Sequence, residues 1–115
     1  MTQPDRIQLL QGTLDLLVLR TLVFGAQHGH GIMTAIRQTS EDVLLIDNGS
    51  LYPSLQRLER GGLIASDWGT SDNNRRARFY KLTRAGRAKL AAETSKWNKM
   101  VRAVGRVLKT VAETP

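Results

Sequence analysis

The residues of this chain best suited to molecular recognition form a run of hydrogen-bonding side chains between Gly49 and Arg60. Leu51, Leu55 and Leu58 recur at intervals of four and three, so a helix here buries one apolar stripe and turns its polar residues outward. Hydroxyl, amide and guanidinium groups bind phosphates and base edges. The pattern predicts a DNA-reading helix whose contacts are Ser50, Tyr52, Ser54, Gln56 and Arg57.

The limits of this helix are also encoded locally. Pro53 lacks an N–H and is tolerated only in a first turn, so we expect the helix to start within residues 48–50, with Asp47 as its cap. Gly61 and Gly62 follow Arg60 and should end it.

A second basic group follows in a predicted hairpin. Residues 63–69 and 77–83 are strand candidates, and the polar residues 70–76 between them suit a turn. Three arginines within four positions favour a clamp on DNA phosphates over an ordinary solvated hairpin. The residues of this clamp are Arg75, Arg76 and Arg78.

Size and charge agree with a polyanionic partner. The 115 residues suffice for one domain, and the formal net charge is +7. After Asn74 the chain carries 12 Lys and Arg against 2 Asp and Glu, so the basicity is concentrated in the last third. Nucleic acid and anionic membrane are both compatible with this charge, although many of the last basic residues should form a solvated helix face.

Other classes of function find little support. The chain has no cysteine, and His28 and His30, one residue apart, are a weak metal constellation better read as a turn or helix cap. No phosphate-binding loop, carboxylate pair or serine with a base indicates an enzyme, and no cofactor is implied. Residues 1–11 lack a signal-peptide layout, and no apolar run reaches the ~20 residues of a membrane span. We therefore expect a soluble cytoplasmic protein.

Two further helices should precede the reading helix. Residues 14–24 are apolar on most sides and predict a central buried helix, with Thr13 as its cap and Asp15 near its positive end. Residues 25–31 form a turn, residues 30–38 a second helix, and residues 43–46 a strand or packed loop. The expected fold is mainly α with a small β-hairpin, a winged helix-turn-helix followed by a long C-terminal dimerisation helix.

That last helix should span residues 84–113, capped by Thr83. Its apolar positions repeat at 4, 3, 4, 3, 4 and 3, with Thr94 as the one polar member, which predicts a seam for a partner helix. Packing on its own domain is the alternative, but ~30 helical residues extend ~45 Å and outrun so small a body. We divide the chain into a DNA-binding domain, 1–83, and a dimerisation helix, 84–115. The dimer contacts are Leu90, Trp97, Val101, Val104, Leu108 and Val111.

Taken together, these motifs resemble the PadR-type transcriptional regulators, in particular the short branch with one C-terminal helix. The resemblance covers nearly the whole chain. Its most specific parts are the Leu51-Tyr52-Pro53 helix start and the arginine-rich wing ending in Leu82-Thr83. Relatives usually carry an aromatic residue at His30 and often a glycine at Asn74, so this chain departs from the pattern there.

The resemblance implies a homodimeric DNA-binding repressor with the third helix in the major groove and the wing on the backbone or minor groove. Effectors of the family can bind near the dimer interface, so Trp97 either packs in the dimer core or also walls a pocket for a small aromatic effector. Our interpretation is a sequence-specific regulator of a palindromic operator on double-stranded DNA. The alternative is a winged-helix module that binds protein or RNA.

Overall fold

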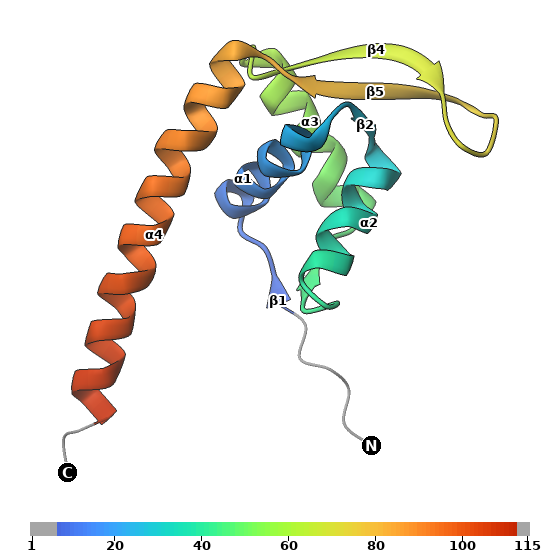
Figure 1. Ribbon diagram of the computed structural model, residues 1–115. Coiled ribbons are helices and arrows are strands. Elements are labelled where there is room, and N and C mark those ends of the chain that lie inside the picture. Colours follow the sequence, from blue (N-terminus) through green and yellow to red (C-terminus); the bar gives the residue numbers. More distant parts are fainter. Residues whose placement is uncertain (1–6, 113–115) are drawn as a thin grey trace, which may run out of the picture.

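The computed structural model describes residues 7–112 and is shown in Figure 1. Three helices form a compact body from which a β-hairpin and a long helix extend (Figure 1). The helices are α1 (Gln11–Thr21), α2 (Gly29–Thr39), α3 (Asn48–Arg60) and α4 (Arg84–Ala112), with a 3-10 turn, η1 (Leu22–Phe24). The strands are β1 (Ile7–Gln8), β2 (Gln27–His28), β3 (Leu44–Leu45), β4 (Ile64–Thr70) and β5 (Arg76–Leu82). The predicted fold class, mainly α with a small β-hairpin, is confirmed.

The core lies where α1 meets the other elements. Val18, in the middle of α1, is completely buried, as are Ile32 of α2 and Leu51 of α3. The apolar stripe of α3 therefore faces inward as its spacing predicts, because a helix with apolar residues every three to four positions buries them on one face.

The start and end of α1 differ from the sequence prediction. The helix begins at Gln11 after Leu10, which offers no capping side chain, so the predicted Thr13 cap is wrong. Its last turn tightens into η1, and Phe24 is exposed although the apolar run predicted burial. Arg20 covers the Phe24 ring, with its guanidinium carbon 5.1 Å from the ring centroid.

The sheet contains a strand that the sequence did not indicate. Its order is β2, β5, β4, with both pairs antiparallel. The segment 25–31, predicted to be only a turn, supplies β2 and the first residues of α2. Two residues are too short for a period-two pattern, so only pairing with β5 defines this strand. A separate parallel pair joins β1 to β3. The strand β3 lies in residues 43–46, the segment predicted to be a strand or a packed loop.

Both ends of α3 are fixed as expected. The Asp47 side chain accepts a hydrogen bond from the Ser50 N–H, at 2.8 Å. At the other end Gly62 has a φ of +76°, which a side chain would strain, and the Leu63 N–H donates to the Leu58 carbonyl. This is a Schellman motif, and it turns the chain directly into β4.

The turn of the hairpin is closed by Asn74. Its φ is +58°, in the left-handed region, and its N–H donates to the Ser71 carbonyl. Asparagine tolerates this conformation better than most side chains do, so the turn closes here without a glycine.

The long helix α4 is attached rigidly to the body. Thr83 caps it as predicted, because its hydroxyl accepts from the Gly86 N–H and donates to the Gly62 carbonyl. A Cβ on Gly86 would lie 2.0 Å from the Leu63 carbonyl oxygen, so only glycine permits this approach. Leu90, predicted to begin the seam between chains, packs instead in the chain's own core.

Beyond that point α4 leaves the body and presents an apolar stripe. Trp97, Val101, Val104 and Leu108 of the predicted seam are exposed. Met100 and Val107, which the sequence analysis did not include, are also exposed and broaden the stripe. Val111 lies in α4, but its side chain is outside the described residues. No helix within residues 7–112 has the length and apolarity needed to cross a membrane.

Candidate nucleic-acid interface

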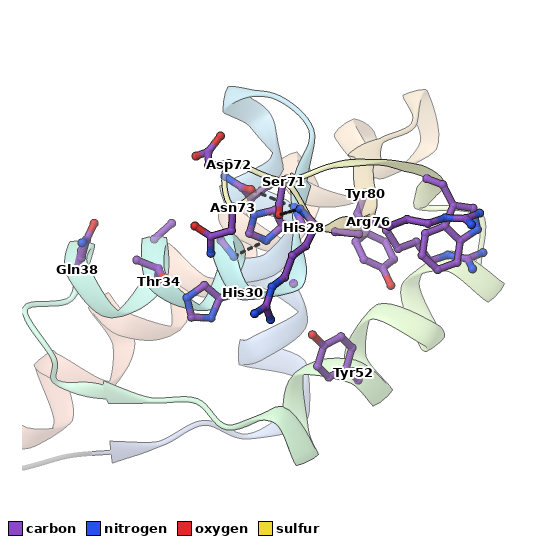
Figure 2. Close-up of a pocket in the computed structure, with 18 residues that line it drawn as sticks. His28, His30, Thr34, Gln38, Tyr52, Ser71, Asp72, Asn73, Arg76 and Tyr80 are labelled. Atoms are coloured by element: carbon purple, nitrogen blue, oxygen red, sulfur yellow. Dashed lines mark hydrogen bonds between the residues drawn. The ribbon is translucent and has the colours of Figure 1, made fainter.

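A groove of about 1030 Å³ separates α2 and the start of α3 from the hairpin, which we call the wing. Figure 2 shows His30, Thr34 and Gln38 from α2, Tyr52 from α3 and the wing residues around this space. Arg75, Arg76 and Arg78 all line it, so the fold brings the predicted clamp beside the predicted reading helix. The groove is open to solvent, and basic side chains lie along its wing side.

The predicted contacts on α3 divide by exposure. Ser50, Tyr52 and Gln56 are exposed, and Tyr52 lines the groove. The Tyr52 hydroxyl also lies close to Gly29 at the start of α2, where an added Cβ would be 2.8 Å from it. The Tyr52 ring therefore packs between α3 and the start of α2. Because 44% of its surface is exposed, Tyr52 can also form hydrogen bonds with DNA.

Ser54 does not point outward, and this part of the sequence prediction is wrong. Its side chain is fully buried, and its hydroxyl donates to a carboxylate oxygen of Asp15. Arg57 donates to the same oxygen at 2.8 Å and retains a third of its side-chain exposure. This cluster could not be predicted from local sequence, because Asp15 lies 39 residues before Ser54 and its position near the start of α1 already suits the dipole of that helix.

On the wing, the Trp68 ring packs against two of the arginines, Arg76 and Arg78. Trp68 is paired across the hairpin with Arg78, and the Arg76 guanidinium carbon lies 4.5 Å from the centroid of its ring. Stacking on an aromatic face attracts a guanidinium and leaves its edge free to donate to phosphate. Trp68 was not among the predicted site residues, although an aromatic residue close to arginines in a hairpin is a signal that the sequence contains.

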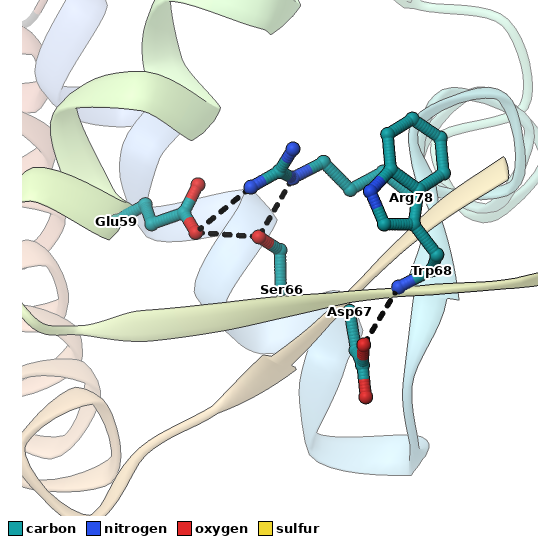
Figure 3. A network of polar contacts seen from close by, with 5 residues as sticks. All are labelled: Glu59, Ser66, Asp67, Trp68 and Arg78. Atoms are coloured by element: carbon teal, nitrogen blue, oxygen red, sulfur yellow. Dashed lines mark hydrogen bonds and ion pairs between the residues drawn. The ribbon is translucent and has the colours of Figure 1, made fainter.

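Arg78 is more strongly restrained than its neighbours. Its Nε donates to the Ser66 hydroxyl at 2.8 Å, and its Nη2 lies 3.8 Å from the Glu59 carboxylate (Figure 3). The Ser66 hydroxyl in turn donates to Glu59. This network joins α3 to the wing, so Arg78 fixes the wing in addition to contributing charge.

The side of the groove formed by α2 was missed at the sequence level. His30, Thr34 and Gln38 are spaced by four residues, which places them along one helix face, and each is exposed or partly exposed. Neighbouring His28 caps α2 through Nδ1, which accepts from the Gly31 N–H, so the cap interpretation of this histidine is confirmed. Within the described residues no cluster of three or more His, Cys, Asp or Glu side chains could hold a metal.

The floor of the groove is a buried tyrosine. Burial raises the pKa of Tyr80, outweighing the opposite effect of the Arg78 charge. The phenol therefore remains neutral in the physiological range and adds no negative charge beside the arginines.

A second groove lies where α4 leaves the body. It has a volume of about 610 Å³, and its walls are mainly apolar, including Leu10 and Leu16 of the α1 region and Trp97 and Met100 of α4. It is continuous with the exposed apolar stripe of α4.

Comparison with known proteins identifies the group to which this arrangement belongs. Residues 18–92 match the model of the transcriptional regulator PadR-like family, a range that covers the end of α1, all of α2 and α3, the wing and the start of α4. The chain belongs to the PadR-like family. The match includes both the exposed face of α3 and the arginine-rich wing, and it makes the protein a DNA-binding transcriptional regulator and not an enzyme.

Individual relatives agree with this assignment. The chain is 39% identical to the transcriptional regulator Rv3488 of Mycobacterium tuberculosis over 59 residues, which cover 51% of this chain and 54% of that protein. It is similar in structure to a PadR family transcription regulator from Clostridium difficile, with a TM-score of 0.74 and 26% identity over 84% of this chain and 99% of the other. A PadR family regulator from Eggerthella lenta gives a TM-score of 0.73 and 29% identity, covering 87% and 85%.

Proposed function

We propose that this PadR-like regulator is a homodimer that represses transcription by occupying a palindromic operator. The observation that carries the proposal is the groove shared by α2, α3 and the wing, where Tyr52 of the reading helix lies across from the arginines of the wing. A regulator that covers its operator excludes polymerase from the same DNA, which makes repression the simplest outcome of tight binding.

Base reading is assigned to the exposed positions Ser50, Tyr52 and Gln56 of α3. Glutamine pairs with adenine in the major groove, and the hydroxyl groups contact bases or phosphates. Arg75 and Arg76 neutralise phosphates, and Trp68 orients Arg76 for that contact. Arg78 adds charge from its fixed position beside Glu59.

Dimerisation is assigned to the stripe of α4. Its exposed side chains are apolar from Trp97 to Leu108, about three helical turns, and apolar stripes of this kind associate in water. Two-fold symmetry of such a dimer would present two copies of α3 to DNA and would explain a palindromic site.

The groove at Trp97 is assigned to a small aromatic effector. Its apolar walls and volume suit a planar ligand, and it adjoins the proposed dimer interface. A ligand there would contact both α4 and α1, which links its binding to the arrangement of the reading elements.

Selection of bound duplexes from random double-stranded DNA tests the proposal. We expect the selected sequences to share two inverted half-sites whose centres are separated by about one helical turn or a multiple of it. Selection of single, unpaired sites would contradict the dimeric arrangement, and recovery of no preferred sequence would contradict operator recognition. Placing the selected site over a promoter in transcription in vitro then separates repression from activation.

A further inference from the structure

A polar cluster lies between α1 and α3, inside an otherwise apolar contact. Asp15 of α1 receives hydrogen bonds from both Ser54 and Arg57 of α3 on one carboxylate oxygen. Asp15 keeps 23% of its side-chain exposure, and Ser54 keeps none. The cluster is therefore largely shielded from water, where charged hydrogen bonds are strong and directional.

The direction of Arg57 follows from its place on the helix. Ser54 and Arg57 are three residues apart, so both lie on the α3 face that looks toward α1. The Nε of Arg57 is buried without a hydrogen-bond partner in the structure. To read a base with the guanidinium nitrogen that binds Asp15, Arg57 would have to give up its hydrogen bond to that partly buried carboxylate, whereas the exposed Gln56 has no such bond to lose.

We propose that Asp15 is a positioning residue for the reading helix and that Arg57, bound to it, holds α3 in place instead of reading a base. The inference rests on the proposed function and corrects one residue that the sequence suggested as a DNA contact. Apolar contacts have no direction, so leucine packing alone does not fix the rotation of α3 about its own axis. The hydrogen bonds to Asp15 fix this rotation and therefore determine which side chains of α3 reach the bases.

The first test is Asp15→Asn, which keeps the shape of the side chain and removes its charge. Released Arg57 then adds a free cation beside DNA. We expect affinity for a scrambled duplex to rise and the slope of log affinity against log salt to steepen by about one unit per half-site. The ratio of affinities for the selected and scrambled duplexes should fall by about tenfold, as coupled residues commonly show. An unchanged ratio would overturn the proposal.

The second test compares Arg57→Met with Arg60→Met. Both remove one positive charge from α3, but Arg60 is exposed at the helix end and has no contact with Asp15 in the structure. Arg57→Met should relax the base preference at several positions of each half-site, because α3 as a whole is no longer held in one rotation about its axis. Arg60→Met should leave the pattern of preference intact. Relaxation at a single base pair by Arg57→Met would identify a base contact and would refute the positioning role.

The double variant Asp15→Asn with Arg57→Met distinguishes the two roles energetically. A positioning pair predicts that the double variant loses no more discrimination than either single variant, since each removes the same link. A base-reading arginine predicts that its full effect persists in the Asp15→Asn background.

Two controls keep the outcomes interpretable. Thermal unfolding monitored by circular dichroism checks that each variant is folded. Ser54→Ala removes one hydrogen bond and no charge, so it should lower the discrimination ratio without changing the salt slope. Full discrimination in this variant would count against the proposal.

The wild type separates the two proposals. If the wild type shows no preferred duplex, the proposed function fails. If the wild type and its variants discriminate equally well between duplexes, only the positioning role is contradicted.

Discussion

The polar residues of α3 differ in role according to the surface that each one faces. Ser50 and Gln56 face solvent, whereas Ser54, on the same short helix, is buried against Asp15. Tyr52 is intermediate, because its ring fills the space beside Gly29 and its surface is 44% exposed. Residue type alone does not separate these cases, since serine occurs in both.

Gln56→Ala tests base reading at this scale. The change removes an exposed amide that can pair with adenine and leaves the charge untouched, so preference should fall by ~1–3 kcal/mol at one position of each half-site. Repeating the selection with the variant measures this. Binding to random DNA serves as the internal control and should stay almost constant. Unaltered preference at every position would show that Gln56 reads nothing.

Arg75→Ala combined with Arg76→Ala tests the phosphate contacts of the wing. Both arginines are exposed at the groove, so their loss should weaken binding to all duplexes and make the salt slope shallower by about two units per half-site. Titrations at several salt concentrations give the slope. Arg102→Ala with Lys109→Ala removes the same charge from α4, away from the groove, and should leave the slope almost unchanged. A loss of operator binding with an unaltered slope would argue that the wing reads bases.

At the scale of elements, the decisive feature is how α4 starts. Thr83 bonds both to α4 and to the loop after α3, and Gly86 lies against the Leu63 carbonyl. The wing strand β5 therefore passes into α4 with a single residue between them. The reading helix, the wing and the long helix meet at this junction.

Gly86→Ala should disrupt the junction. An added Cβ would overlap the Leu63 carbonyl, and we expect a loss of about 1–3 kcal/mol in the free energy of unfolding, as for overpacked cores. Gly105→Ala is the matched control in the same helix, since nothing lies within 4 Å of its added Cβ, and alanine should favour the helix by up to ~1 kcal/mol. Chemical denaturation at equal protein concentration compares the two. Equal stability of both variants would show that the junction adjusts freely.

Sequence reasoning succeeded mostly where a signal is local, although the predicted Thr13 cap of α1 was wrong. The caps at Asp47 and Thr83 and the stop at Gly62 each depend on a few neighbouring residues, and the structure confirms them. It failed where the partner is distant in sequence. Asp15 reaches Ser54 across 39 residues, and β2 exists only because β5 lies beside it.

The same distinction applies to the two ends of the predicted seam. Heptad spacing includes Leu90 as readily as Val104, yet Leu90 is covered by its own chain and Val104 is exposed. Periodicity identifies which face of a helix is apolar. It does not identify whether that face meets the same chain or another one.

At the scale of the whole molecule, the chain extends 59 Å in its longest direction and only 22 Å in its shortest. The wing runs along one side of the helical body and α4 along another, and the two elements meet at Thr83 (Figure 1). The residues of the apolar stripe of α4 do not line the groove, so the stripe lies apart from it. This separation allows a partner chain to cover the stripe while the groove stays open to DNA.

Replacing Val101 and Val104 with Asp tests that arrangement. Two charges in the proposed dimer contact would lose hydration without gaining partners, so the variant should sediment as a monomer at concentrations where the wild type is a dimer. Ser95→Asp with Asn98→Asp adds the same charge to exposed α4 positions outside the stripe and should leave the dimer intact. A wild type that sediments as a monomer at roughly tens of micromolar would contradict dimerisation through α4.

The short junction at Thr83 has a consequence for the DNA. Because only one residue separates β5 from α4, and hydrogen bonds hold that residue on both sides, the chain has no flexible linker with which to adjust its reach. In a dimer built on α4, the distance between the two reading helices would be a constant of the protein. DNA is stiff over so short a span, so inserting about five base pairs between half-sites would turn one of them to the far side of the duplex. The spacing between the two half-sites of the operator, as well as their base sequence, would then be part of what this protein recognises.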